Sequence, residues 1–309
     1  MSTDAAVRPV PATSGPVRRR RLSREAVENR IFGTARWVAI IVLLVVTLFP
    51  FYYMIILSFR SLDEVVQHPG ALWVPPSELH WDSYAAVLRS ADSGGQGFLS
   101  FMRNSALVAI GTVLVTLAIA VPGSYAISRL RFFGRRQVSG LFLAVYLFPS
   151  ILLAVPLFVF FTRIGLRGSL VGLLIVYVSQ IVAVSVYMLR NYFDTIPISL
   201  EEAASIDGCS RLQIMRHISL PLAMPALLSN ALFVFMIAWN EFLFALLFLI
   251  GNRGSWTVSL GLSQLAGSIE IPTTVLMAGS VVLTLPIIII FFAAERLLTE
   301  GLTAGAEKG

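Results

Sequence analysis

Residues 199–222 read SLEEAASIDGCSRLQIMRHISLPL, the longest polar run in the second half of an otherwise apolar chain. Two short helices are expected here, because Ser199 and Ser210 each stand three residues before a Glu or Gln, the spacing of a capping box. Gly208 separates the two helices. Glycine adopts positive φ without steric cost, so Gly208 is the expected left-handed end of the first helix. The run is therefore predicted to form a helix–turn–helix outside any apolar layer.

Composition assigns the whole chain to a membrane. Of its 309 residues, 57% are hydrophobic and 13% are charged, whereas a soluble domain carries about 25% charged residues. Cys209, the single cysteine, has no partner for an intrachain disulfide, and the three histidines share no metal-ligand spacing. The net charge of +6 comes with arginines beside apolar runs, which indicates membrane topology and not nucleic-acid binding. Neither a metal site nor a nucleic-acid partner is predicted.

Six apolar runs are long enough to be transmembrane helices, and they are 37–58, 104–127, 138–161, 170–189, 226–250 and 273–294. An arginine cluster precedes the first run, and Arg129, Arg131, Arg135 and Arg136 follow the second. The positive-inside rule therefore places both segments, and both chain termini, in the cytoplasm. Pro149 and Pro156 are expected to kink the third run. The predicted fold is an all-α membrane protein with six transmembrane helices.

The segments between the apolar runs define the domain organisation. A disordered, Arg-rich cytoplasmic tail (1–30) is predicted to precede one transmembrane domain (31–298) and a cytoplasmic C-terminal tail (299–309). Within the transmembrane domain, two outer loops and one long cytoplasmic loop are expected, at 60–102, 251–271 and 191–222. The cytoplasmic loop contains the helix–turn–helix.

The first outer loop carries one helical pattern. Trp81, Tyr84, Ala85 and Leu88 follow the i, i+3, i+4, i+7 rule. This spacing predicts a short amphipathic helix along the outer membrane interface, while packing within the loop would produce the same pattern.

Polar residues are rare inside the predicted spans. Glu241, next to Asn240, is their one acidic residue. An acid at the centre of a span costs about 2.5 to 3.5 kcal/mol, so Glu241 should face a cavity or a polar partner. A structural hydrogen bond between helices fits equally well. Gln180 and Tyr187 likewise fit either interhelical hydrogen bonds or contacts with a passing solute.

Enzyme motifs are missing from the sequence. It contains no P-loop, GxSxG, HExxH or dinucleotide fingerprint. The spans also lack the paired acids or histidine clusters that a membrane-embedded enzyme would need. The chain is therefore not predicted to be an enzyme or to hydrolyse ATP by itself.

The polar run resembles the EAA loop of ABC importer permeases. The resemblance rests on the spacing of Glu202, Ala203, Ala204, Asp207, Gly208, Ile218, Leu220 and Pro221. Two further stretches, AWNEFLFAL at 238–246 and GLTAGAEKG at 301–309, are similar to the sugar-importer branch, specifically to membrane subunits of the maltose-transporter type. Cys209 stands where that family usually has alanine, and the Arg-rich N-terminal tail is extra.

This resemblance implies a type I ABC importer permease architecture in a bacterial or archaeal cytoplasmic membrane. A second permease, expected to form a heterodimer with this one, would complete the pathway. Two ATPase subunits would bind ATP and Mg²⁺, and an extracytoplasmic sugar-binding protein would deliver the substrate. This chain would bind lipid but no cofactor. The residues of the EAA pattern would dock into the ATPase, the loop 251–271 would project toward the binding protein, and the C-terminal tail would reach toward the ATPase interface.

An alternative function is a stand-alone, proton-driven secondary carrier that uses Glu241. It leaves the helix–turn–helix unexplained, and the sequence shows no internal repeat of the kind common in such carriers. The sequence therefore favours the permease of an ATP-driven carbohydrate importer. Asn240, Glu241, Gln180 and Tyr187 are its candidate pathway residues.

Overall fold

The computed structural model describes residues 24–306, with side chains described from 31 to 295. Within this range the chain is helical and contains no strand, which confirms the all-α prediction. It forms two compact units, Met1–Tyr52 and Tyr53–Gly309. Helix α1 (Arg24–Ser58) begins in the first unit and ends in the second.

Both predicted tails are partly helical. Most of the N-terminal tail, up to residue 23, lies outside the described residues, but α1 already begins at Arg24. At the other end, α14 (Thr273–Ala306) continues through most of the predicted 299–309 tail, and residues 307–309 lie outside the described part.

Four helices are long and apolar enough to cross a membrane, and they lie in α1, α4 (Phe98–Arg129), α7 (Leu170–Phe193) and α14. Two bent pairs raise the number to six if each pair is one span. The first pair is α5 (Arg135–Leu147) with η3 (Ser150–Leu153) and α6 (Ala154–Arg163), bent by 86°. The second joins Arg211–Leu222 to α11 (Met224–Asn240) at 75°. The predicted multi-span architecture is confirmed.

The two prolines of the third predicted span have different effects. Pro149 follows the end of α5 and caps η3, so the chain bends there. Pro156 lies in the first turn of α6 and does not break it. A helix leaves its first backbone N–H groups unbonded, so the missing N–H of a proline has no cost at that position. The prediction of a kink is correct for Pro149 and wrong for Pro156.

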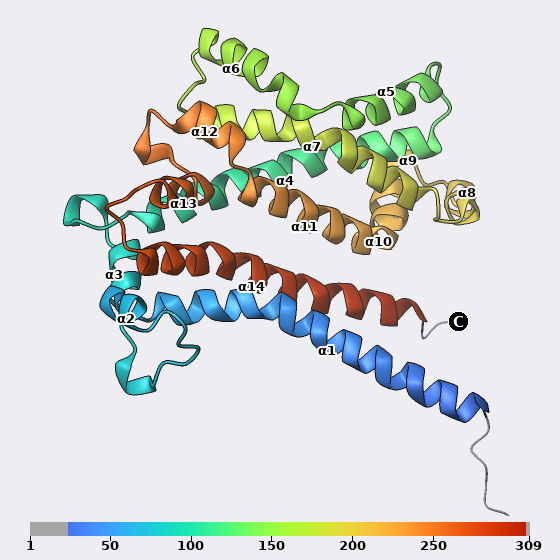
Figure 1. Cartoon of the computed structure of the whole chain (residues 1–309). Coiled ribbons are helices and arrows are strands. Elements are labelled where there is room, and N and C mark those ends of the chain that lie inside the picture. Colours follow the sequence, from blue (N-terminus) through green and yellow to red (C-terminus); the bar gives the residue numbers. More distant parts are fainter. Residues whose placement is uncertain (1–23, 307–309) are drawn as a thin grey trace, which may run out of the picture. The chain divides into compact units, whose positions relative to one another are not determined.

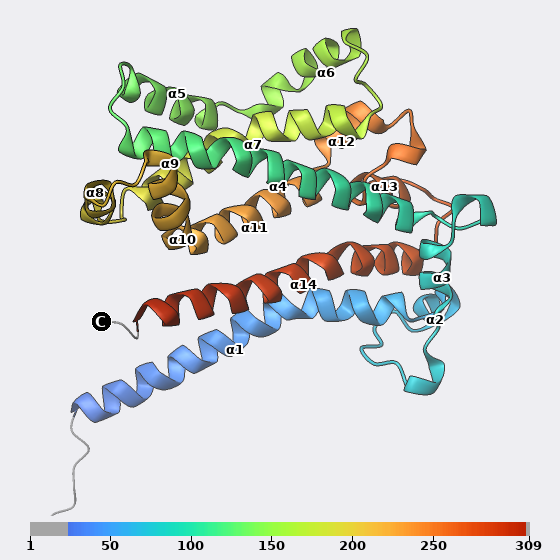
Figure 2. The same ribbon diagram turned by 180° about the vertical axis from the view of Figure 1, so that it is seen from behind.

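The second unit is built around α4, α7 and α11, which pack on one another (Figure 1). Small residues allow close approach, since a Cβ added at Gly111 of α4 would meet Leu174 Cδ1 of α7 at 2.5 Å. Helix α5 packs against α7, as seen from both sides in Figures 1 and 2, and α14 packs against α11. This arrangement fixes α4 and α7 as the scaffold for the polar loops at either end.

The first outer loop contains two short α-helices and two 3₁₀ turns, η1 (Pro76–Glu78) and η2 (Ala91–Ser93). Helix α3 (Asp82–Leu88) confirms the predicted helix, but its buried residues are Ser83 and Val87, and Trp81 and Leu88 are exposed. The helix turns this other face inward because it packs on α14 and α4. Burial also raises the pKa of the Tyr84 phenol, which is bonded to Ser58 Oγ at 2.8 Å. Helix α2 (Leu62–Gln67) was not predicted, although its capping box of Ser61 and Glu64 is visible in the sequence.

Candidate functional site

The polar run 199–222 forms the predicted helix–turn–helix. It lies within the predicted cytoplasmic loop 191–222, which is here named the coupling loop. Helix α8 (Ile198–Ile206) is followed by α9 (Arg211–Ile214), which continues through a π-helical turn, η4 (Met215–Ser219), into α10 (Leu220–Leu222). Pro221 lies within α10, whose C-cap is Ala223, and α11 begins at Met224. The coupling loop thus leads directly into the next apolar helix.

One of the two predicted capping boxes is present. Ser210 Oγ accepts from the backbone N–H of Gln213, and the Gln213 side chain accepts from the backbone N–H of Ser210 over 2.8 Å. The box predicted at Ser199 is wrong. Helix α8 starts two residues earlier, with Pro197 at the N-cap position, so Ser199 lies inside its first turn and does not cap it.

Gly208 ends α8 as predicted. Its φ is +86°, and the N–H groups of Gly208 and Cys209 bond to the carbonyls of Ser205 and Ala204 over 3.2 and 3.0 Å. These two bonds form the Schellman motif of a helix that ends in a left-handed residue. No atom lies within 4 Å of a Cβ added at Gly208, so the backbone conformation, and not lack of space, requires glycine.

The coupling loop presents most of its predicted contact residues to the exterior of the chain. Glu202, Ala203, Asp207, Gly208 and Pro221 are exposed, Ile218 and Leu220 are half-buried, and Ala204 is buried. Two apolar neighbours, Ile206 and Leu212, are 86% and 68% exposed. Exposed apolar side chains grouped with polar ones are typical of a protein-binding surface.

Sequence reasoning missed the residue that anchors this surface. Glu201, next to the predicted Glu202, is buried. Its Oε1 accepts from Arg129 Nε over 2.8 Å and from Ser219 Oγ over 2.9 Å, and its Oε2 accepts from the Tyr125 hydroxyl over 3.2 Å. Arg129 and Tyr125 belong to the last turns of α4. The only sequence signal was the three-residue spacing of Glu201 and Ala204, which places both on one face of a helix.

A polar cavity of about 580 Å³ lies between α4, the α4–α5 turn and α8. Arg131, Arg135 and Arg211 line it together with Glu202 and Ser205. Three arginines of the cluster that fixed the predicted topology, Arg129, Arg131 and Arg135, therefore lie beside α8.

The second predicted set of residues is centred on Glu241, where the fifth apolar run is interrupted. Helix α11 ends at Asn240, Glu241 has an extended backbone with ψ 130°, and α12 (Leu243–Leu249) begins after it. The prediction of one continuous span over 226–250 is therefore wrong. The Glu241 carboxylate accepts from the N–H groups of Phe244 and Ala245 over 2.8 and 3.2 Å, and so caps α12.

Two other helices hold this break in place. The Tyr177 hydroxyl of α7 donates to Glu241 Oε2 over 2.6 Å, and Ser259 Oγ of α13 (Val258–Ala266) donates to the Glu241 carbonyl over 2.7 Å. The carboxylate thus hydrogen-bonds to the backbone of α12 and to the Tyr177 side chain of α7, which agrees with the structural alternative left open by the sequence. Asn240 is exposed, and its side chain donates to Met236 O of its own helix over 2.9 Å.

The remaining candidates lie on α7. Gln180 lines a cavity of about 450 Å³ together with Ser179 and the α5–α6 bend, including Phe148. Tyr187 is exposed, nearly two helical turns further along α7. Gln180 stands three residues after Tyr177, the residue that donates to Glu241, and among the described hydrogen bonds none joins Gln180 or Tyr187 directly to Asn240 or Glu241.

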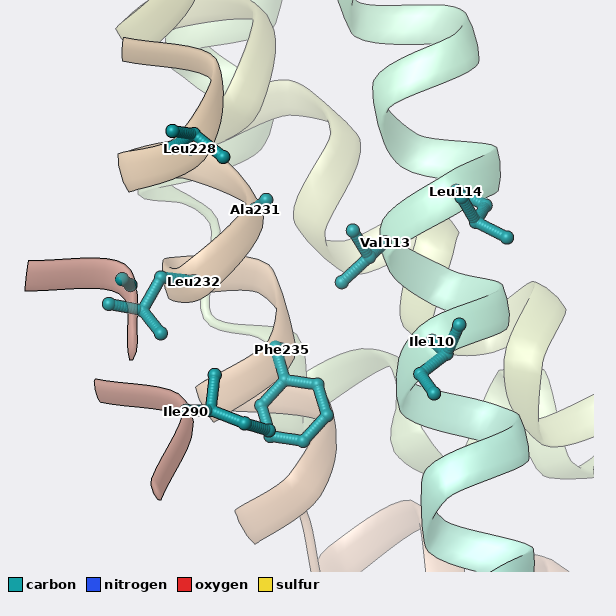
Figure 3. A pocket seen from close by; sticks show the side chains of 9 residues that line it. Ile110, Val113, Leu114, Leu228, Ala231, Leu232, Phe235 and Ile290 are labelled. Carbon is teal, nitrogen blue, oxygen red and sulfur yellow. The ribbon is translucent and has the colours of Figure 1, made fainter. Parts of the chain in front are cut away.

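Another cavity, of about 230 Å³, lies between α4, α11 and α14 (Figure 3). Its lining is apolar and includes Ile110, Val113, Leu228 and Phe235. A sugar needs convergent hydrogen-bonding groups, so this cavity is unsuited to a sugar.

The predicted outer loop 251–271 is more ordered than its Gly and Ser content indicates. It contains η5 (Arg253–Ser255) and the nine residues of α13. The buried Asn104 of α4 donates to the carbonyls of Gly254 and Trp256 over 2.8 and 3.0 Å, and the Arg253 guanidinium lies 5.3 Å from the centre of the Trp256 ring. The tip residue Ile269 is fully exposed.

The fold and the coupling loop together give a chain with several apolar helices and an exposed helix–turn–helix. The chain belongs to the family described as "binding-protein-dependent transport system inner membrane component", whose model matches residues 116–303. It is therefore an ABC importer permease, a transport subunit and not an enzyme.

Similar proteins cover nearly the whole chain. The inner membrane ABC transporter permease protein YcjP of Escherichia coli is 39% identical over 86% of this chain and 93% of its own. The trehalose/maltose transport system permease protein MalG of Thermococcus litoralis is 36% identical over 93% of this chain and 99% of its own. Among solved structures, a bacterial ABC transporter involved in the import of the acidic polysaccharide alginate matches with a TM-score of 0.75 and 26% identity, over 87% of this chain and 97% of that one.

Proposed function

We propose that this chain is the permease subunit of an ATP-driven importer for a carbohydrate, and that it forms half of the translocation pathway. The observation that carries the proposal is the exposed coupling loop with the EAA spacing, anchored in α4 by a buried ion pair. The carbohydrate assignment is supported by relatives whose names specify trehalose, maltose or diacetylchitobiose transport.

The proposed partners are two cytoplasmic ATPase subunits, a second and different permease, and an extracytoplasmic sugar-binding protein. ATP and Mg²⁺ would be bound by the ATPases. This division of labour accounts for a chain that has a docking surface but no nucleotide motif. The proposed location is a bacterial or archaeal cytoplasmic membrane, with both termini and the coupling loop on the cytoplasmic side, which is the side given by the arginine clusters.

The proposed role of the coupling loop is to convert closure of the ATPases into a rigid-body tilt of the permease helices. Moving an inward-open to outward-open equilibrium from 1:99 to 99:1 takes about 5.5 kcal/mol of differential binding. The contact residues for this step are Glu202, Ala203, Ala204, Asp207, Gly208, Ile218, Leu220 and Pro221. Ala204 is buried, so its part is to let α8 lie close to the bundle.

The proposed pathway contacts are Gln180 with the adjoining Phe148, and Asn240 at the α11 break. An amide beside an aromatic ring suits a neutral sugar, which is recognised by hydrogen bonds and ring contacts. Tyr187 is retained as a pathway candidate because it is exposed on α7. Glu241 would act indirectly, by fixing the position of Asn240.

The test is to purify the chain from its native membrane with its partners and to reconstitute the complex in vesicles. We expect an ATPase and a second permease to copurify, and uptake of maltose or trehalose to require ATP and the binding protein. We expect the chain alone to hydrolyse no ATP. Uptake by the isolated chain that follows a pH gradient and is abolished by Glu241→Gln would overturn the proposal in favour of a proton-driven carrier.

A further inference from the structure

We propose that Glu201 is a positioning residue that makes the coupling loop and α4 move as one body. The inference rests on the proposed function, because it assigns the path by which movement of the ATPases would enter the membrane helices. It concerns Glu201 and its partners, not the exposed residues of the EAA pattern.

The first step is the way α8 attaches to the rest of the unit. Helix α8 buries two side chains, Glu201 and Ala204. The side chain of Ala204 is a methyl group and forms no hydrogen bond. The hydrogen bonds from the buried side chains of α8 are therefore those of the Glu201 carboxylate. That carboxylate forms a buried ion pair with Arg129, whose side chain is 5% exposed.

The second step is that α4 also holds the segment leading into α8. Another nitrogen of Arg129, Nη2, donates to the Ile196 carbonyl over 2.7 Å. One residue earlier on α4, Ser128 Oγ donates to the Asp194 carboxylate. The last turn of α4 therefore binds α8 from two sides, through its carboxylate and through the chain just before it.

The third step is that the same carboxylate holds the segment leading out of the coupling loop. Ser219, at the end of η4, is fully buried and donates to Glu201 Oε1. The chain from η4 runs through α10 into α11, which packs on α4 and α7. Glu201 thus joins the first helix and the exit of the coupling loop to α4, and Arg129 and Ser128 join its entry to α4.

The charge of Glu201 makes the attachment of α8 to α4 resist displacement. In a buried ion pair the directional hydrogen bonds are strong, and removal of one partner leaves the other charge buried and uncompensated. Displacement of α8 relative to α4 would separate Glu201 from Arg129 and is therefore opposed. Glu202 is exposed and lines the polar cavity, without the buried hydrogen bonds that Glu201 makes.

The test measures the distance between α8 and α4 in the assembled permease–ATPase complex. The background variant is Cys209→Ser, and it carries one spin label on Ser199→Cys of α8 and one on Ile119→Cys of α4, both exposed positions. The control is Glu78→Gln, because Glu78 is an exposed glutamate of the first outer loop. In this control and in the otherwise unsubstituted chain, we expect one narrow distribution of inter-label distances that ATP does not alter. In Glu201→Gln we expect the distribution to broaden and to respond to ATP.

The functional readout is the amount of maltose or trehalose transported per ATP hydrolysed. We expect Glu201→Gln to lower this ratio about tenfold while complex assembly and ATP hydrolysis persist, since the lost quantity is a coupling free energy. Tyr125→Phe and Ser219→Ala each remove one hydrogen bond but keep the ion pair, and we expect smaller changes in the same direction. These two variants test the proposal if the Glu201→Gln protein does not accumulate in the membrane.

An unchanged distance distribution and transport ratio in these variants would overturn the proposal. A parallel fall of assembly, hydrolysis and transport would also overturn it, because that result marks a role in folding alone. Failure of the proposed function is distinguishable, because it appears in the unsubstituted chain as absence of ATPase copurification. The label distances still report whether Glu201 fixes α8 to α4 in that case.

Discussion

The Tyr177 hydroxyl donates a 2.6 Å hydrogen bond to Glu241 Oε2 and so joins α7 to the break between α11 and α12. The sequence singled out Glu241 because an acid in an apolar run is costly. The structure accounts for it as a cap on α12 that is held by a neighbouring helix. A residue that looks like a proton carrier in the sequence therefore has a structural role.

Glu241→Ala is expected to destabilise the protein by about 1 to 3 kcal/mol, because it leaves two buried backbone N–H groups and a phenol without their acceptor. Glu241→Gln keeps an acceptor oxygen and should cost less. Thermal unfolding of the purified complex measures both. Asn240→Ala is the control, since that side chain bonds only to its own helix. Equal stability of Glu241→Ala and Asn240→Ala would contradict the capping role.

Gly208 has positive φ, and no atom lies within 4 Å of a Cβ added there. The effect of a substitution on transport should therefore depend on how well the new residue tolerates positive φ, and not on the size of its side chain. Gly208→Asn is expected to retain most transport because asparagine tolerates the left-handed conformation. Gly208→Val should lose transport while ATP hydrolysis and membrane insertion persist, because a β-branched residue strongly disfavours that conformation. Transport per ATP in vesicles measures the effect. Equal activity of the two variants would argue against a conformational requirement.

Cys209 is exposed in the coupling loop and is the single cysteine of the chain, so it reports on docking without any substitution. We expect a membrane-impermeant maleimide to label it readily in inside-out vesicles that contain the permease alone. Bound ATPase subunits should protect it. Labelling from the external side of sealed cells would contradict the cytoplasmic placement, and labelling that is insensitive to the ATPase would contradict docking at this loop.

The two serines of the coupling loop make a matched pair for capping. Ser210→Ala should destabilise α9 by about 1 kcal/mol, the usual cost of a lost N-cap. Ser199→Ala should be close to neutral because Ser199 caps no helix. The rate at which trypsin cleaves the chain at Arg211 provides the measurement, and it should rise for the first variant only.

The features that the sequence predicted correctly depend on neighbouring residues alone. The Ser210 box, the turn at Gly208 and the apolar runs each follow from spacing or composition within a few turns. Even there, local rules misplaced the start of α8 by two residues, because the helix begins directly after Pro197 and not after Ser199.

What only the tertiary structure decided depends on residues far apart in the chain. Glu201 and Glu202 are chemically identical neighbours, and their roles differ because Arg129, 72 residues away, lies against one of them. The apolar run 226–250 reads as one helix, and its break is held by Tyr177, 64 residues earlier. By itself the sequence determined which runs are apolar enough to cross a membrane and where the chain forms a helix–turn–helix, since local hydrophobicity and capping govern both. Helix packing decided which acid is buried and which is exposed, because a buried charge is stable only where a distant partner is placed to receive it.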